Sequence, residues 1–135
     1  MSEWNQKTID EFRANEGKVG GFFEGKSLLL LHHMGAQSKT DRVNPLAYQA
    51  VDGGYAVFAS KGGADTNPDW LYNVRAHPET KIEVGTEIVA VTAREAEGEE
   101  RERIWNKQVR DWPGFGEYEV KTAREFIPVV VLETI

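Results

Sequence analysis

The chain of 135 residues is 40% apolar and 28% charged, carries a formal net charge of −6 and contains no cysteine. These values fit one domain, residues 1–135, with a single buried core, and they exclude disulfides, thiolate nucleophiles and thiolate metal sites. The negative charge argues against nucleic acid as a partner, and no apolar run approaches the ~18 residues that span a bilayer.

Residues 2–15 have the spacing of an amphipathic helix, with Trp4, Ile9 and Phe12 as apolar anchors. We expect this helix to pack against the domain. Peripheral contact with a membrane is the alternative, although the acidic residues of the segment weaken attraction to anionic lipid. The helix and the glycine-rich connector after it make up residues 1–20. The segment lacks the apolar region of a secretory signal, which predicts a cytoplasmic protein, membrane-associated if the alternative holds.

Continuous and alternating apolar runs predict about six antiparallel strands. Asp52, Gly53 and Gly54 supply the residues that a tight hairpin needs between two of them. Pro128 is expected at a sheet edge or a strand start, because it cannot donate a ladder hydrogen bond. The predicted strands are "KSLLLLHHM" (26–34), "VNPLAYQAV" (43–51), "YAVFAS" (55–60), two runs within "KIEVGTEIVAVTAR" (81–94) and "FIPVVVLETI" (126–135).

Two further helices interrupt the strands. The first has Asn67 as a good N-cap and Pro68 at its first position, and it continues through "DWLYNVRA". The second covers residues 97–111, where apolar side chains fall close to one face. The predicted fold class is mainly β (α+β): a small barrel of about six antiparallel strands with an N-terminal helix and two further helices.

The three histidines do not share a metal site in this prediction. His32 and His33 are neighbours on a strand, so their side chains point to opposite faces of the sheet. His77 follows a helix, where a solvated or C-terminal capping role is usual. We therefore expect no metal.

Two loops at strand ends have the residues of an anion site. "ASKGG" (59–63) places a lysine before two glycines, and "GAQSKTDR" (35–42) carries Ser38, Lys39, Thr40 and Arg42. Such loops can direct backbone N–H groups and cations at a phosphate. Simple structural turns are the alternative. No catalytic triad, phosphate-loop motif or dinucleotide fingerprint is present.

An aromatic segment, "DWPGFGEY" (111–118), follows the last predicted helix. We interpret it as a loop. Its residues Trp112, Phe115 and Tyr118 are three positions apart and either close one end of the core or form the wall of a pocket for a flat ligand. Both interpretations stay open on these residues alone.

Taken together, several segments resemble the deazaflavin-dependent nitroreductases, a family of the split-barrel flavin and deazaflavin oxidoreductases. Each segment alone is a weak signal, whereas their order and spacing over nearly the whole chain make the match specific. The segments are "ANEGKVGGFFEGKSLLLLHHMGAQS", "RVNPLAY", "GGYAVFASKGGADTNPDWLYNVRAHP", "WPGFGEY" and "TAREFIPVVVLE".

The resemblance implies a split β-barrel that binds coenzyme F-420, in an actinobacterium. In that family the two loops embrace the phosphate and the acidic oligoglutamate tail of the cofactor, and an open glycine backbone with a lysine suits this task. The implied cofactor-binding residues are Ser38, Lys39, Thr40, Arg42, Asn44, Pro45, Ala59, Ser60, Lys61, Gly62, Gly63, Asn67, Trp70 and Asn73, with Trp70 mostly structural.

The aromatic segment matches the part of the family that lies over the substrate side of the ring. Implied substrate-binding residues are Tyr48, Trp112, Phe115 and Tyr118. Members that reduce nitroimidazoles place tyrosines where this chain has Trp112 and Phe115, so nitroimidazole activation is in doubt. Ser60 and Tyr118 are the candidate catalytic residues: Ser60 as a hydrogen-bond donor near the reacting centre, Tyr118 as a proton donor or acceptor-orienting group.

The implied activity is hydride transfer from reduced F-420 to a flat, electron-poor small molecule such as a quinone, an activated alkene or a nitroaromatic compound. One alternative is a non-catalytic protein that binds the deazaflavin or a lipid-like ligand. Another is a split barrel that holds flavin mononucleotide (FMN). The chain is compatible with a monomer or a homodimer.

Overall fold

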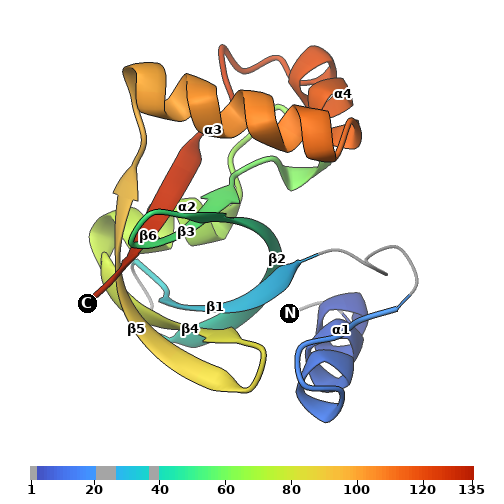
Figure 1. Ribbon diagram of the computed structural model, residues 1–135, viewed down its shortest axis with the longest axis vertical. Coiled ribbons are helices and arrows are strands. Elements are labelled where there is room, and N and C mark those ends of the chain that lie inside the picture. The colour runs from blue at the N-terminus through green and yellow to red at the C-terminus, as the bar shows by residue number, and fades with distance from the viewer. Residues whose placement is uncertain (1–2, 21–26, 37–39) are drawn as a thin grey trace.

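A computed structural model describes residues 3–20, 27–36 and 40–135 (Figure 1). Within them, no helix has both the length and the apolar character required to cross a bilayer. The elements in chain order are α1 (Glu3–Ala14), β1 (Leu28–Met34), β2 (Asp41–Val51), β3 (Gly54–Phe58), the 3-10 turn η2 (Lys61–Gly63), α2 (Asp69–Ala76), β4 (Glu79–Val84), β5 (Glu87–Glu95), α3 (Gly98–Asp111), α4 (Gly114–Lys121) and β6 (Val129–Thr134).

The six strands close into a barrel in the order β1-β2-β3-β6-β5-β4, and every neighbouring pair is antiparallel. The predicted barrel of six antiparallel strands is therefore confirmed. The ring closes where β1 meets β4, and this seam has only two paired positions, Leu30 with Glu83 and Leu31 with Ile82. The other pairs are longer, so the seam is the shortest ladder of the barrel.

Alternation along the strands divides the apolar side chains between the barrel interior and its outer surface. Leu29 and Leu31 of β1 belong to an interior cluster, which Trp70 of α2 joins. Leu28 and Leu30 pack instead with α1. A third cluster joins β3 and β6 to α3 and α4. In Figure 1, α3 and α4 lie together on one side of the barrel, away from α1.

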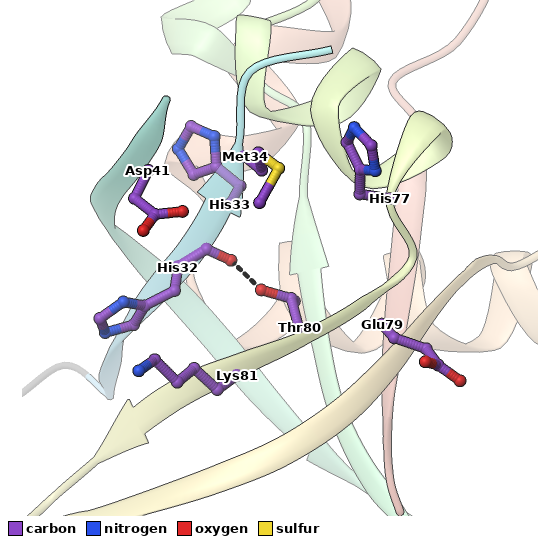
Figure 2. A pocket seen from close by; sticks show the side chains of 8 residues that line it. All are labelled: His32, His33, Met34, Asp41, His77, Glu79, Thr80 and Lys81. Carbon is purple, nitrogen blue, oxygen red and sulfur yellow. Dashed lines mark hydrogen bonds between the residues drawn. The ribbon is translucent and has the colours of Figure 1, made fainter. Parts of the chain in front are cut away.

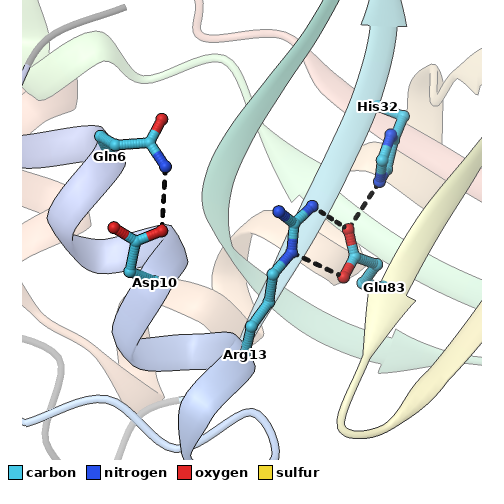
Figure 3. A network of polar contacts seen from close by, with 5 residues as sticks. All are labelled: Gln6, Asp10, Arg13, His32 and Glu83. Carbon is cyan, nitrogen blue, oxygen red and sulfur yellow. Dashed lines mark hydrogen bonds and ion pairs between the residues drawn. The ribbon is translucent and has the colours of Figure 1, made fainter.

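Helix α1 docks on the barrel as predicted for the N-terminal segment. Its residues Ile9 and Phe12 are buried against β1. Arg13 adds a bidentate ion pair to Glu83 of β4, at 3.1 and 2.7 Å, and Glu83 also contacts His32 Nε2 at 2.7 Å (Figure 3). These bonds hold the pKa of Glu83 below its usual value, with the Arg13 hydrogen bond as the largest cause. Contact with a membrane through this apolar face would require both side chains to leave the cluster.

The aromatic segment forms a helix where a loop is predicted. Residues Gly114–Lys121 make up α4, which adds a fourth α-helix to the three expected. Two glycines lower the intrinsic helix propensity of this segment, which hides it from sequence reasoning. Packing favours it: Phe115 is buried, and a Cβ on Gly116 would lie 3.2 Å from Val109 Cγ1 of α3. Gly116 therefore allows α4 to approach α3 closely.

The predicted N-cap of α2 is wrong by one residue. The helix begins at Asp69, and Pro68 occupies the N-cap without a side-chain cap hydrogen bond. Asn67 Oδ1 instead accepts a hydrogen bond from Arg124 at 2.7 Å. The side-chain oxygen of Asn67, which the local sequence predicts as the cap of α2, thus binds Arg124, a residue far along the chain.

Candidate active site

Two adjoining pockets lie beside the turn that follows β3. The first, of about 300 Å³, is called the aromatic pocket because Phe58, Trp112, Phe115 and Tyr118 are among its lining residues. The second, of about 380 Å³, is called the polar pocket and includes His33, Arg42 and Asp69. Because the two share lining residues, they form one continuous groove. The shared residues are Asn44, Lys61, Pro68 and Trp70.

The aromatic wall is built around Phe115 of α4. Its ring lies edge-on to Trp112 at 5.1 Å, to Tyr118 at 5.4 Å and to Phe58 at 5.4 Å between centroids. Such edge-to-face pairs stabilise a cluster beyond simple burial. The two interpretations left open for these residues thus hold together, since they close the outer core and line a pocket. The Tyr118 hydroxyl forms no hydrogen bond with residues that the structure describes.

The turn between the two pockets has an unusual backbone. Lys61, Gly62 and Gly63 have φ values of 47°, 63° and 82°, the left-handed region that favours glycine. The Gly63 N–H donates to Ser60 O at 2.9 Å, and the Ala64 N–H donates to Lys61 O at 3.1 Å. A Cβ on Gly62 would meet nothing within 4 Å, so Gly62 presents open backbone to the groove.

Gly63 has a different role from its neighbour. A Cβ there would lie 3.1 Å from Tyr118 Cα and 3.2 Å from Tyr118 O. The missing side chain therefore allows the backbone of α4 to rest on the turn. The glycine pair combines one open face with one tight packing contact.

Arg124, which sequence reasoning does not single out, contacts the same strand end. It donates from Nη1 to Ala59 O and to Asn67 Oδ1, both at 2.7 Å, and from Nη2 to Ser60 O at 2.8 Å. Its Nε donates to Thr122 Oγ1 at 2.9 Å. No local pattern indicates these contacts, because more than 50 residues separate Arg124 from three of its four acceptors.

A chain of polar contacts through the buried side chains of Asn73 and His33 lies beneath the polar pocket. The Ala36 N–H donates to Asn73 Oδ1 at 2.9 Å, which turns the Asn73 amide nitrogen toward His33 Nδ1, also at 2.9 Å. His33 then carries its hydrogen on Nε2 and donates to Asn44 Oδ1 at 2.6 Å. Burial lowers the pKa of His33, which favours this neutral form. The chain fixes the orientation of Asn44 at the groove.

A third pocket, of about 550 Å³, lies between the diverging ends of β1 and β4 (Figure 2). His32, His77 and Thr80 line it, and His77 occupies the C-cap of α2. His32 and His33 contact Glu83 and Asn44 respectively, which confirms their predicted opposite directions. This pocket is larger than either pocket of the groove taken singly, but it contains neither the glycine turn nor the aromatic wall, so we place the candidate active site in the groove.

The model of one protein family, described as F420H(2)-dependent quinone reductase, matches residues 4–134. The chain belongs to this family. An F420H(2)-dependent quinone reductase of Mycobacterium tuberculosis is 33% identical over 125 residues, which cover 90% of this chain and 83% of that protein. A solved structure described as an F420-H2 dependent reductase is 39% identical, with a TM-score of 0.69 over 78% of this chain and 93% of that one.

A second solved structure, described as a domain-swapped dimer, is 37% identical, with a TM-score of 0.73 over 95% of this chain and 93% of that one. The predicted resemblance to deazaflavin-dependent reductases is confirmed by these matches. The protein is thus an F-420-dependent reductase, an enzyme rather than a non-catalytic binder. The FMN alternative receives no support from the family match.

The reductase brings many of the predicted site residues together in the groove. Ser38 and Lys39 lie outside the described residues. Others fall below or beside the groove: Ala59 is buried, Asn73 is buried beneath it, and the exposed Thr40 lines neither pocket. Those that line it are Arg42, Asn44, Pro45, Ser60, Lys61, Gly62, Trp70, Trp112, Phe115 and Tyr118.

Tyr48 lies apart from the groove. Its ring packs edge-on against Tyr55 at 5.3 Å, next to the barrel interior. Leu46 and Tyr48 both pack against the interior cluster, but only Leu46 also lines the aromatic pocket. Sequence reasoning did not name Phe58, Leu46 and Ala47 as lining residues. Their alternation on predicted strands indicated burial but not a pocket.

The two glycines of the turn provide a matched pair of substitutions. Both Gly62→Ala and Gly63→Ala impose a left-handed φ on alanine, at a cost of about 1 kcal/mol. Only Gly63→Ala also forces the backbone of Tyr118 away from the turn. We expect Gly63→Ala to lower the free energy of unfolding by at least about 2 kcal/mol more than Gly62→Ala in urea denaturation. Equal losses would show that α4 does not depend on this contact.

Proposed function

We propose that this reductase transfers a hydride from reduced F-420 to a flat, electron-poor acceptor held in the aromatic pocket, with quinones as the preferred class. The observation that carries this proposal is the continuous groove in which an open, cationic turn adjoins an aromatic wall. The relative from Mycobacterium tuberculosis is named as a quinone reductase, which favours quinones over activated alkenes and nitroaromatic compounds.

The polar pocket fits the anionic part of the cofactor. Lys61 and the exposed Arg42 supply positive charge, and Gly62 leaves room for close approach to the backbone. The amides of Lys61 and Gly62 donate to no described residue, so they are available to a phosphate oxygen. Asp69 begins α2 and opposes an anion at that helix end. We therefore assign the phosphate to the side of Lys61 and Arg42.

The aromatic pocket fits a planar acceptor. When bound, the reduced deazaflavin supplies the hydride, so the protein needs no nucleophile of its own. Trp112 and Phe115 offer flat apolar surfaces that orient the acceptor and exclude water. Tyr118 of α4 lines this pocket, and its hydroxyl is available to donate a proton to the reduced acceptor or a hydrogen bond that orients an oxygen of the acceptor. Ser60 lies at the junction of turn and pocket, where its hydroxyl can donate a hydrogen bond.

Binding of the cofactor tests this assignment directly. We expect purified protein to bind F-420 and not FMN in parallel fluorescence titrations. Lys61→Ala removes one cation from the groove and should raise the Kd for F-420 about tenfold, as for loss of one charge-assisted contact. Lys81→Ala, an exposed cation outside the groove, is the matched control. Equal effects of the two substitutions, or preference for FMN, would contradict the assignment.

The role of Tyr118 is tested by removing one oxygen. Tyr118→Phe keeps the ring that packs on Phe115 and should lower kcat for quinone reduction at least tenfold, with a smaller change in KM. Tyr72→Phe serves as the control, because Tyr72 is exposed on α2. Ser60→Ala should lower kcat to a lesser extent. An unchanged kcat in Tyr118→Phe, measured by oxidation of reduced F-420, rules out the proton-donor role.

We also propose that the reductase is a homodimer. The support is the similar solved structure described as a domain-swapped dimer, which covers 95% of this chain. Light scattering should give a mass twice the 15.2 kDa of the chain. A monomer mass at micromolar concentration would reject this proposal without affecting the assignment of the groove.

A further inference from the structure

Arg124 stands in the segment that joins α4 to β6, and its guanidinium makes four hydrogen bonds of 2.7 to 2.9 Å. A guanidinium has five N–H donors in a rigid fork. Here one branch of the fork holds Ala59 O and Asn67 Oδ1 and the other holds Ser60 O. The side chain is thus committed to the strand end and the loop on either side of the Lys61–Gly63 turn.

The acceptors are the ones that determine the shape of the turn. Ser60 O also accepts the Gly63 N–H, so one carbonyl both closes the turn and binds Arg124. Lys61, the residue after it, has a positive φ without being glycine. Such a conformation persists only where surrounding contacts hold it. The guanidinium of Arg124 supplies such contacts, because it binds the carbonyls of Ala59 and Ser60 directly before Lys61.

Arg124 differs from the other well-bonded arginines in its partners. Arg13, Arg75 and Arg94 each pair with a glutamate carboxylate. Arg124 forms no ion pair with a described residue, and its four acceptors are neutral oxygens. Burial lowers its pKa, but an arginine remains charged at neutral pH. Its contacts therefore fix the positions of these oxygens and do not neutralise its charge.

Thr122 and Ala123, which precede Arg124 in the chain, also bond to the loop after β3. Thr122 Oγ1 donates to Ala64 O at 2.7 Å, and the Ala123 N–H donates to Asp65 Oδ1 at 2.8 Å. Segment 121–124 therefore runs along the loop from Ala59 to Asn67 with a bond at nearly every step. Of these bonds, only those of Arg124 reach the carbonyls that precede Lys61.

We propose that Arg124 is a positioning residue of the cofactor site: its guanidinium holds the carbonyls of Ala59 and Ser60 and so keeps the Lys61–Gly63 turn in the form that presents Lys61 and the open backbone of Gly62 to F-420. This inference rests on the proposed assignment of the cofactor to the groove. Holding of the turn, however, is a property of the protein without ligand and can be measured separately.

The test uses Arg124→Lys, which keeps the positive charge and removes the fork. Arg94→Lys is the matched control, because Arg94 makes equally short bonds, to Glu100 and Glu133, outside the groove. Amide exchange followed by NMR reports on the turn through the bonded N–H groups of Gly63 and Ala64, with the Thr134 N–H as a reference in the sheet. Fluorescence titration with F-420 reports on binding.

We expect the Gly63 and Ala64 amides to exchange at least tenfold faster in ligand-free Arg124→Lys, with Thr134 unchanged. The Kd for F-420 should rise at least tenfold, while Arg94→Lys changes neither quantity. Asn67→Ala, which removes one acceptor of Arg124 Nη1, leaves the guanidinium in place and changes no lining residue of the groove, should shift both in the same direction by a smaller factor. This milder variant also decides the matter if Arg124→Lys does not fold.

Three results would overturn the proposal. Exchange at Gly63 and Ala64 that is unchanged in the Arg124 and Asn67 variants would show that the turn keeps its shape without Arg124. Faster exchange with an unchanged Kd would show that the shape of the turn does not govern binding. Wild-type protein that fails to bind F-420 would reject the proposed function, and the cofactor role of Arg124 with it, whatever the exchange rates.

Discussion

The close contact between Gly63 and the backbone of Tyr118 joins the two halves of the groove. A Cβ at Gly63 would lie only 3.1 Å from Tyr118 Cα, so the absence of a side chain there allows the turn and α4 to lie this close. The turn carries Lys61 and the helix carries the aromatic wall around Phe115. A small residue at one backbone position thus fixes the distance between the cationic part and the aromatic part of the site. A protein interior transmits such a constraint because it is closely packed.

Three cations without ion pairs to described residues lie at or near the groove of this acidic protein. The chain carries −6 overall, yet Arg42, Lys61 and Arg124 near the groove form no ion pair with described residues. Several other cations are paired with carboxylates on the outer surface. These three cations add positive charge at the groove, and a cleft between low-dielectric walls focuses the field of such charges. An acidic protein can in this way attract an acidic cofactor.

The barrel could be predicted from the sequence because its signals are local. Alternating apolar residues, the glycines of the hairpin at Gly53 and the apolar run of β1 each indicate a strand without help from distant residues. Helix α4 could not be predicted, since its glycines weaken the local signal and its stability comes from Phe115 and the contact of Gly116 with α3. Cooperative tertiary packing overrides propensity in such short helices.

In the candidate site, too, local motifs could be predicted and contacts between distant residues could not. The glycine turn and the aromatic trio were recognisable as motifs, and the fold places them in one groove. The role of Arg124 could not be recognised, because the carbonyls that it binds belong to Ala59 and Ser60, about 65 positions earlier in the chain. The same contact explains why Asn67 does not cap α2. Tyr48 lines neither pocket, which a match of segments alone does not indicate.

The aromatic wall depends on one short element outside the ring of strands. Trp112, Phe115 and Tyr118 all come from the eight-residue helix α4 or the residues just before it, whereas Lys61, Gly62 and Asn44 come from the barrel and its turn. Apart from Phe58 of β3, the aromatic wall therefore comes from a different stretch of the chain than the cationic turn. Substitutions in α4 can change this wall while the ladders of the barrel stay intact. Under the proposed function, the choice of acceptor would then depend largely on one short helix, while the barrel that holds the cofactor side is kept.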